Sequence, residues 1–68
     1  MTKKLQRITT AYYEAKRFMD RCDVLFDRME SDEQLVRNIN GGLGSKETAA
    51  VRRASMDLTR ALAEVRKP

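Results

Sequence analysis

The sequence predicts an all-α protein, and three observations support that prediction. Apolar residues recur at alternating spacings of three and four over two long segments, which is the period of an amphipathic α-helix. All three glycines lie within residues 41–44 and the single proline is Pro68, so neither segment is interrupted. A chain of 68 residues allows one domain, residues 1–68. We therefore expect two main helices in an antiparallel hairpin.

The first helix is expected over about residues 3–30. The apolar positions with heptad spacing, called the predicted seam, are Leu5, Ile8, Tyr12, Ala15, Met19, Cys22, Phe26 and Met29. Such a seam is typical of a helix that packs against other helices along its length. Ala11, Phe18 and Leu25 lie beside the seam and widen it into a face suited to the core of a bundle. We expect the seam, including Tyr12 and the thiol of Cys22, to be buried.

The apolar pattern falters over residues 30–34. Ser31, with Gln34 three residues later, matches the capping box that begins many helices. The sequence therefore predicts either a break or a kink near Ser31. After a break, a short helix would run over about residues 32–39.

The glycines belong to the stretch NGGLGSKET, residues 40–48. A nucleotide-triphosphate loop requires Gly-x-x-x-x-Gly-Lys-Ser/Thr. Here Lys46 stands one position too late after Gly44, and Ile39 stands where the first glycine is needed. The sequence thus argues against such a loop.

The same stretch fits a turn between two helices. Gly41 or Gly42 is placed to end the short helix in the left-handed conformation. Ser45 is a good N-cap, and Glu47 in the first turn complements the helix dipole. The alternative is a weak anion site of free N–H groups with Lys46, which the charge of Glu47 opposes.

The last helix is expected over about residues 46–67. Its apolar positions are Val51, Ala54, Leu58, Ala61 or Leu62, and Val65. A two-helix hairpin leaves one side of each apolar stripe in water, and so small a domain needs further stabilisation. We therefore expect two hairpins to pair as a homodimeric four-helix bundle.

Acidic residues form a row on the first helix: Asp20, Asp23, Asp27 and Glu30, at spacings of three and four. Paired carboxylates can bind a divalent ion or act as acid and base, but a charge match with arginines between helices or molecules is the simpler interpretation. The candidate interaction residues are Asp20, Asp23, Asp27, Arg52 and Arg53.

Basic residues gather near the two chain termini, which an antiparallel hairpin places at the same end, and the net charge is +4. The candidate polyanion-binding residues, called the basic pole, are Lys3, Lys4, Arg7, Lys16, Arg17, Arg66 and Lys67. They predict either a solubilising cluster or a contact for phosphates or an acidic protein.

The counts of histidine and cysteine limit the classes of function that the chain can have. The chain has no histidine, which removes the commonest metal ligand and general base, and Cys22 is its single cysteine. We expect no enzyme activity, no metal, no cofactor and no membrane partner, and the unpaired thiol favours a cytoplasmic location.

The outline of a short helical hairpin with a long seam resembles the plasmid Rop type of RNA-binding dimeric bundle. The segment SKETAAVRRASMDLTRAL, residues 45–62, is similar to the C-terminal helix of phage hairpin proteins that sequester cyclic-nucleotide signals of bacterial defence. The small, charged, cysteine-poor helical character of the chain would suit a phage or mobile-element protein. We expect a non-enzymatic regulatory protein that binds or inhibits another protein through a helical face. The alternative is a helical dimer that binds nucleic acid or a nucleotide through the basic pole.

Overall fold

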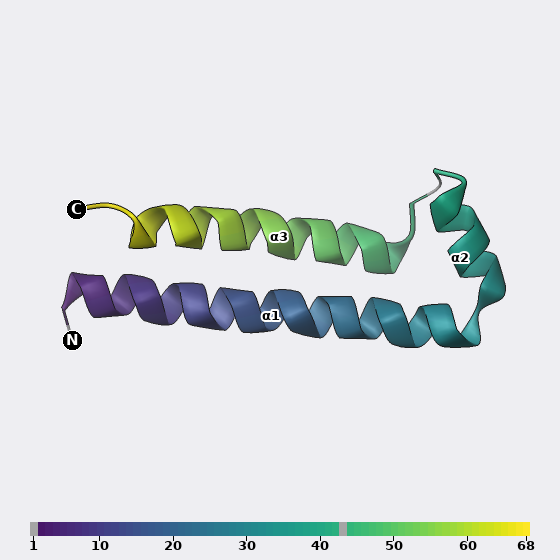
Figure 1. Ribbon diagram of the computed structural model, residues 1–68, viewed down its shortest axis with the longest axis horizontal. Helices are drawn as coiled ribbons and strands as arrows, with labels where there is room; N and C mark the ends of the chain where they lie inside the picture. Colours follow the sequence, from purple (N-terminus) through teal and green to yellow (C-terminus); the bar gives the residue numbers. More distant parts are fainter. Residues whose placement is uncertain (1, 43) are drawn as a thin grey trace.

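Three helices make up the regular structure of the described chain. The computed structural model describes residues 2–42 and 44–68, and within these ranges no strand occurs. Helix α1 spans Lys3–Ser31, α2 spans Glu33–Asn40 and α3 spans Lys46–Val65. The prediction of three helices with a long first helix is therefore confirmed. Helices α1 and α3 lie side by side and run in opposite directions, so both termini lie at one end (Figure 1).

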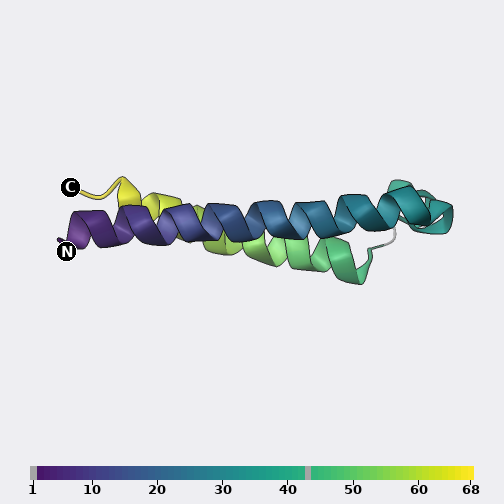
Figure 2. The ribbon, with the colours of Figure 1, turned by 90° about the horizontal axis from the view of Figure 1, so that it is seen from below.

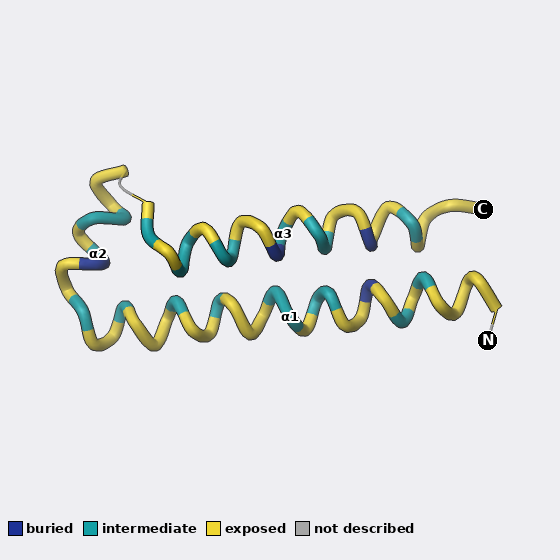
Figure 3. Tube along the Cα trace, turned by 180° about the vertical axis from the view of Figure 1, so that it is seen from behind, coloured by how far each residue is buried: buried dark blue, intermediate teal, exposed yellow. Residues whose placement is uncertain are grey.

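Few residues of α1 and α3 are buried, and they lie where the two helices face each other (Figure 3). Ala11 on α1 is buried, as are Ala54 and Ala61 on α3, and Ala54 is 0% exposed. Alanine ends at Cβ, so two helices that meet at alanines approach closely. Figure 2 shows that α3 crosses α1 at a shallow angle instead of lying strictly parallel to it.

Helix α1 packs on α3 along a different line from the predicted seam. The residues on this line, which are buried or half-buried, are Ala11, Ala15, Phe18, Cys22, Leu25 and Met29. Their spacing is again four and three, so they form a second heptad frame that overlaps the first. The two frames share Ala15, Cys22 and Met29. Because Ala54 and Ala61 offer a close approach, α3 covers the frame that contains Ala11.

The expectation that the whole predicted seam is buried is therefore wrong for the single chain. Five of its members, called the exposed stripe, are 50–63% exposed: Leu5, Ile8, Tyr12, Met19 and Phe26. Cys22 is half-buried. One neighbouring helix covers roughly one heptad frame, and the exposed stripe lies in the frame that α3 leaves open.

Helix α3 follows its predicted pattern more closely. Ala54 and Ala61 are buried, and Val51 and Leu58 are half-buried. At the position where the sequence left two options, Ala61 faces α1 and Leu62 is 43% exposed.

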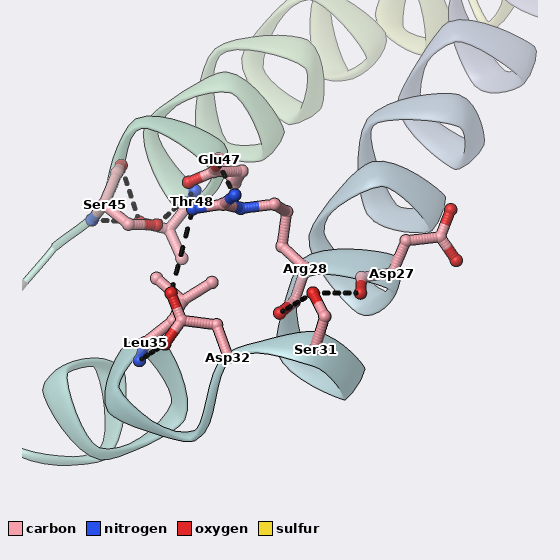
Figure 4. Close-up of polar contacts among 8 residues, drawn as sticks. All are labelled: Asp27, Arg28, Ser31, Asp32, Leu35, Ser45, Glu47 and Thr48. Carbon is pink, nitrogen blue, oxygen red and sulfur yellow. Dashed lines mark hydrogen bonds and ion pairs between the residues drawn. The ribbon is translucent and has the colours of Figure 1, made fainter.

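The junction between α1 and α2 is a break, with its cap one residue later than predicted (Figure 4). The carboxylate of Asp32 accepts the backbone N–H of Leu35 at 3.1 Å. The Ser31 hydroxyl donates to the carbonyl oxygens of Asp27 and Arg28, at 3.4 and 3.2 Å. The assignment of Ser31 as the N-cap is wrong because its hydroxyl already bonds inside α1, while Asp32 has extended backbone and a carboxylate that accepts the N–H of Leu35.

The turn between α2 and α3 has the predicted signals. The N–H of Gly41 donates to the carbonyl of Arg37 at 2.9 Å, and Gly42 has φ of 89°, a conformation that glycine adopts without strain. Ser45 begins α3: its hydroxyl accepts the N–H of Thr48 at 3.0 Å, and Thr48 accepts the N–H of Ser45 at 2.8 Å. This reciprocal pair caps the helix from both sides.

An ion pair then ties the start of α3 to the end of α1. Nε of Arg28 lies 3.3 Å from Oε1 of Glu47, whose side chain is 18% exposed (Figure 4). Glu47 is in the first turn of α3, where a carboxylate also interacts favourably with the helix dipole. The contact positions the first turn of α3 against α1 across the turn.

Candidate functional site

The paired helices α1 and α3 have two open sides of different character. Arg21 follows Tyr12 by nine residues, a rotation of about 180° around a helix. The exposed stripe with Tyr12 therefore lies on one side of α1, and Arg21 lies on the opposite side. The first side offers apolar surface, whereas the second carries charge.

The acidic row borders the exposed stripe. Asp23 and Glu30 follow Met19 and Phe26 by four residues, so each carboxylate is a neighbour of an exposed apolar side chain on α1. Asp20, Asp23, Asp27 and Glu30 are all exposed, and among the described residues none of the four forms an ion pair. Four unpaired carboxylates on one row repel each other, so a cationic partner would be bound favourably.

The two arginines predicted to take part in the same interaction share one surface, and one of them also borders a second. Arg52 and Arg53 are adjacent in sequence and therefore differ by about 100° around α3. Both arginines line a wide hollow on the outer surface of α3, and Arg53 also lines a groove between α3 and α1.

The basic pole is partly neutralised within the chain. Glu64 accepts a hydrogen bond from Nζ of Lys67 at 2.8 Å and lies 3.8 Å from Nε of Arg7. The hydrogen bond from Lys67, with the positive charges of Lys67 and Arg7, lowers the pKa of Glu64 below its ordinary value.

The remaining members of the basic pole are spread over several surfaces. Lys3, Lys4, Arg66 and Lys67 are exposed near the end where the two termini meet (Figure 1). Lys16 follows Arg7 by nine residues and so lies on the opposite side of α1. The structure therefore does not bring the seven residues together on one surface.

One member of the basic pole, Arg17, comes together with three other basic residues. A groove of about 310 Å³ between α1 and α3, called the basic groove, is lined by Arg17, Arg21, Lys46 and Arg53 with Ala49 and Ala50. Arg17 is held by Oδ2 of Asp57 at 2.9 Å and Oε2 of Glu14 at 3.3 Å. The hydrogen bond to Asp57 is the main cause that raises the pKa of Arg17 above its ordinary value.

The other three cations of the basic groove are not neutralised. Within the described part of the chain, Arg21, Lys46 and Arg53 have no carboxylate within 4.0 Å. Sequence reasoning missed this cluster because Arg21 and Lys46 are 25 positions apart. The local signals were the i,i+4 spacing of Arg17 with Arg21 and the seven-residue spacing of Lys46 with Arg53, each of which places two cations along one side of a helix.

The described residues offer no metal centre: no three histidine, cysteine, aspartate or glutamate side chains there lie close enough together to hold an ion. None of the helices in the described ranges has the length and apolar character needed to cross a membrane. Comparison with protein-family models, curated proteins and solved structures gave no match.

Proposed function

We propose that this is a non-enzymatic regulatory protein that acts by binding another protein through a helical face of α1. Two chains pair through the exposed stripe as a homodimeric bundle of hairpins, and the acidic row beside that stripe contacts a basic surface of the partner protein. The observation that supports this most directly is the row of four carboxylates that form no ion pair within the described residues and lie next to exposed apolar side chains on one helix.

The occupant proposed for the exposed stripe is a second copy of the chain. A single chain exposes 5559 Å², which is about 1,100 Å² more than the surface expected for a compact monomer of its mass, 7.9 kDa. A standard interface covers about 800 Å² on each partner. The excess is thus large enough for one further interface.

The small core leads to the same proposal. Within the described residues the buried core is Ala11, Leu35, Ala54 and Ala61, and no large side chain is fully buried. A second copy would supply the apolar burial that the single chain lacks, by covering Leu5, Ile8, Tyr12, Met19 and Phe26. Each Å² of apolar surface removed from water contributes roughly 25 cal/mol to stability.

Light scattering during size-exclusion chromatography tests the dimer. We expect a mass of twice 7.9 kDa for the wild type. The double variant Ile8→Glu/Met19→Glu should be monomeric, because it places two charges in the proposed interface. Both residues are exposed in the single chain, so the variant leaves the contacts with α3 intact.

Val24→Glu is the matched control for this experiment. Val24 is 49% exposed and follows Met19 by five residues, about 140° away around α1. It should keep the dimeric mass. A wild-type mass that stays at one chain at all concentrations would contradict the dimer.

Comparative capture tests the proposed protein contact. An affinity-tagged wild-type chain should retain a protein from nuclease-treated lysate in near-equal amount, and Asp20→Asn/Asp23→Asn should lose it while remaining dimeric. The control Glu33→Gln/Gln34→Lys raises the net charge by the same amount on α2 and should retain it. Equal capture by both variants would reject the acidic row as the contact.

The alternative, nucleic-acid or nucleotide binding through the basic pole, has weaker support. Arg7 and Lys67 already share Glu64, and Lys16 lies on the other side of α1. The basic groove is a better place for a polyanion than the pole.

A further inference from the structure

We propose that the basic groove, together with Tyr13 at its edge, binds a single-stranded nucleic acid. This goes beyond the regulatory function proposed above and does not depend on it. All the residues involved belong to one chain, and Arg17 and Arg21 lie on the side of α1 away from the exposed stripe.

The basic groove is positively charged, and three of its four cations form no ion pair within the described residues. Arg21, Lys46 and Arg53 have no acidic partner within the described ranges. Two carboxylates of α3 beside the groove are already engaged, since Asp57 binds Arg17 at 2.9 Å and Glu47 binds Arg28 at 3.3 Å. A phosphate that enters the groove would therefore meet three uncompensated cations.

The shape of the groove suits a phosphate backbone. Ala49 and Ala50 lie between the cations on α3, and their short side chains leave room at the bottom of the groove. The groove is open to solvent and does not enclose a ligand, so it fits a chain that passes along it better than a small molecule that must be surrounded.

The cationic surface continues beyond the groove. Lys46 and Arg53 also border a wider hollow on the outer surface of α3, where Arg52 and Arg60 add two further cations. A strand that carries a phosphate on every nucleotide can contact both surfaces at once, whereas a single small anion cannot. This extension favours a polymer.

Tyr13 distinguishes a nucleic acid from other polyanions. It precedes Arg17 by four residues, which places its ring one turn along the same side of α1. The side chain is 62% exposed, and its ring makes an edge-to-face contact with that of Tyr12, with the two ring centroids 5.3 Å apart. Exposed aromatic rings beside a cationic groove stack on unpaired bases without regard to sequence.

Fluorescence anisotropy with a labelled oligothymidine of about 20 nucleotides tests the proposal, using the full chain. If the three uncompensated cations contact phosphates, affinity should fall about 18-fold between 0.05 and 0.2 M salt, because each contact contributes about −0.7 to the logarithmic salt slope. Arg21→Gln/Arg53→Gln should reduce that slope by about 1.4 and weaken binding about 14-fold at 0.15 M salt. Absence of binding at 0.05 M salt would overturn the proposal.

Two matched variants separate the groove from net charge. Lys16→Gln/Arg37→Gln and Lys3→Gln/Lys4→Gln each remove two positive charges outside the groove. Both should bind the oligonucleotide nearly as well as the wild type. A loss in either that equals the loss in Arg21→Gln/Arg53→Gln would show a general charge effect or a site at the basic pole, and would overturn the assignment to the groove.

Inorganic polyphosphate and Tyr13→Leu test the class of ligand. This variant should weaken oligonucleotide binding several-fold and leave polyphosphate binding unchanged, since only the oligonucleotide has bases to stack. Equal effects on both ligands would overturn the nucleic-acid assignment. Unchanged helicity by circular dichroism confirms folding, and Ile8→Glu/Met19→Glu should still bind if the groove works within one chain, whatever the outcome for the dimer.

Discussion

Arg17 on α1 and Asp57 on α3 are 40 positions apart in sequence, yet Nη1 of Arg17 donates a hydrogen bond to Oδ2 of Asp57 at 2.9 Å. This contact joins the two long helices near their middle and holds Arg17 at the edge of the basic groove. Among the described residues, Asp57 is the one carboxylate of α3 that contacts a cation of the basic groove.

Removing that carboxylate should strengthen anion binding. Asp57→Asn frees Arg17 from its cross-helix partner, and one additional phosphate contact raises affinity roughly fourfold at 0.15 M salt. The measurement is the same oligonucleotide titration. Glu33→Gln, which makes an equal charge change at a side chain 92% exposed on α2, should have little effect. Weaker binding by Asp57→Asn would mean that the tether to Arg17 is required.

The cap of α2 can be tested by two substitutions at one position. Asp32→Ala removes the acceptor for the N–H of Leu35 and should cost about 0.5–2 kcal/mol of unfolding free energy. Asp32→Asn keeps an acceptor and should lose much less, although it removes the ion pair with Arg28 at 3.8 Å. Urea denaturation at one fixed protein concentration gives both values. A larger loss in Ser31→Ala than in Asp32→Ala would restore Ser31 as the cap.

Gly42 should be the sensitive glycine of the turn. Its φ is 89°, so an alanine there is strained even though a Cβ would meet nothing within 4 Å. We expect Gly42→Ala to lower the unfolding free energy by about 1–2 kcal/mol. Gly44→Ala is the control, since its Cβ would only approach Oγ1 of Thr48 at 4.0 Å. Thermal melting of the two variants should therefore differ, and equal melting temperatures would contradict the conformational argument.

Ala54 should tolerate no larger side chain. It is 0% exposed where α3 meets α1, and overpacking a closed contact costs about 1–3 kcal/mol. We expect Ala54→Leu to lower the urea midpoint clearly. Ala63→Leu makes the same change at an exposed position on α3 and should be nearly neutral. A stable Ala54→Leu chain would show that the helices separate easily there.

Glu64 should make the stability of the fold depend on pH in the acidic range. Its pKa is lower in the folded chain, because Lys67 donates a hydrogen bond to it and the charges of Lys67 and Arg7 favour the carboxylate. A lowered folded pKa contributes stability above the unfolded value of about 4.3, and this contribution is lost as the pH falls through the folded pKa. Glu64→Gln should thus be less stable than the wild type at pH 7 and should approach it at pH 2–3. A constant difference across that range would contradict this.

Much of the fold was predictable because its signals are local. The long α1 follows from an uninterrupted heptad pattern, and the start of α3 follows from Ser45 as an N-cap. The cap at Asp32 was placed one residue early, because both Ser31 and Asp32 are residue types that cap helices. The choice depended on whether the Ser31 hydroxyl was free.

The candidate sites divide in the same way. The acidic row could be predicted because Asp20, Asp23 and Asp27 lie on one helix, where spacing alone places them together. The basic groove could not, because Arg21 and Lys46 meet only when α3 returns along α1.

The sequence by itself thus determined the positions of the helices and the residues that share a face of each, since both depend on neighbours within about one helical turn. Only the tertiary structure decided which of two overlapping heptad frames on α1 is covered. Ala15, Cys22 and Met29 belong to both frames, so the pattern could not rank them. The close approach allowed by Ala54 and Ala61 selected the frame of Ala11, and it left Tyr12 and Met19 exposed on one side and the basic groove open on the other.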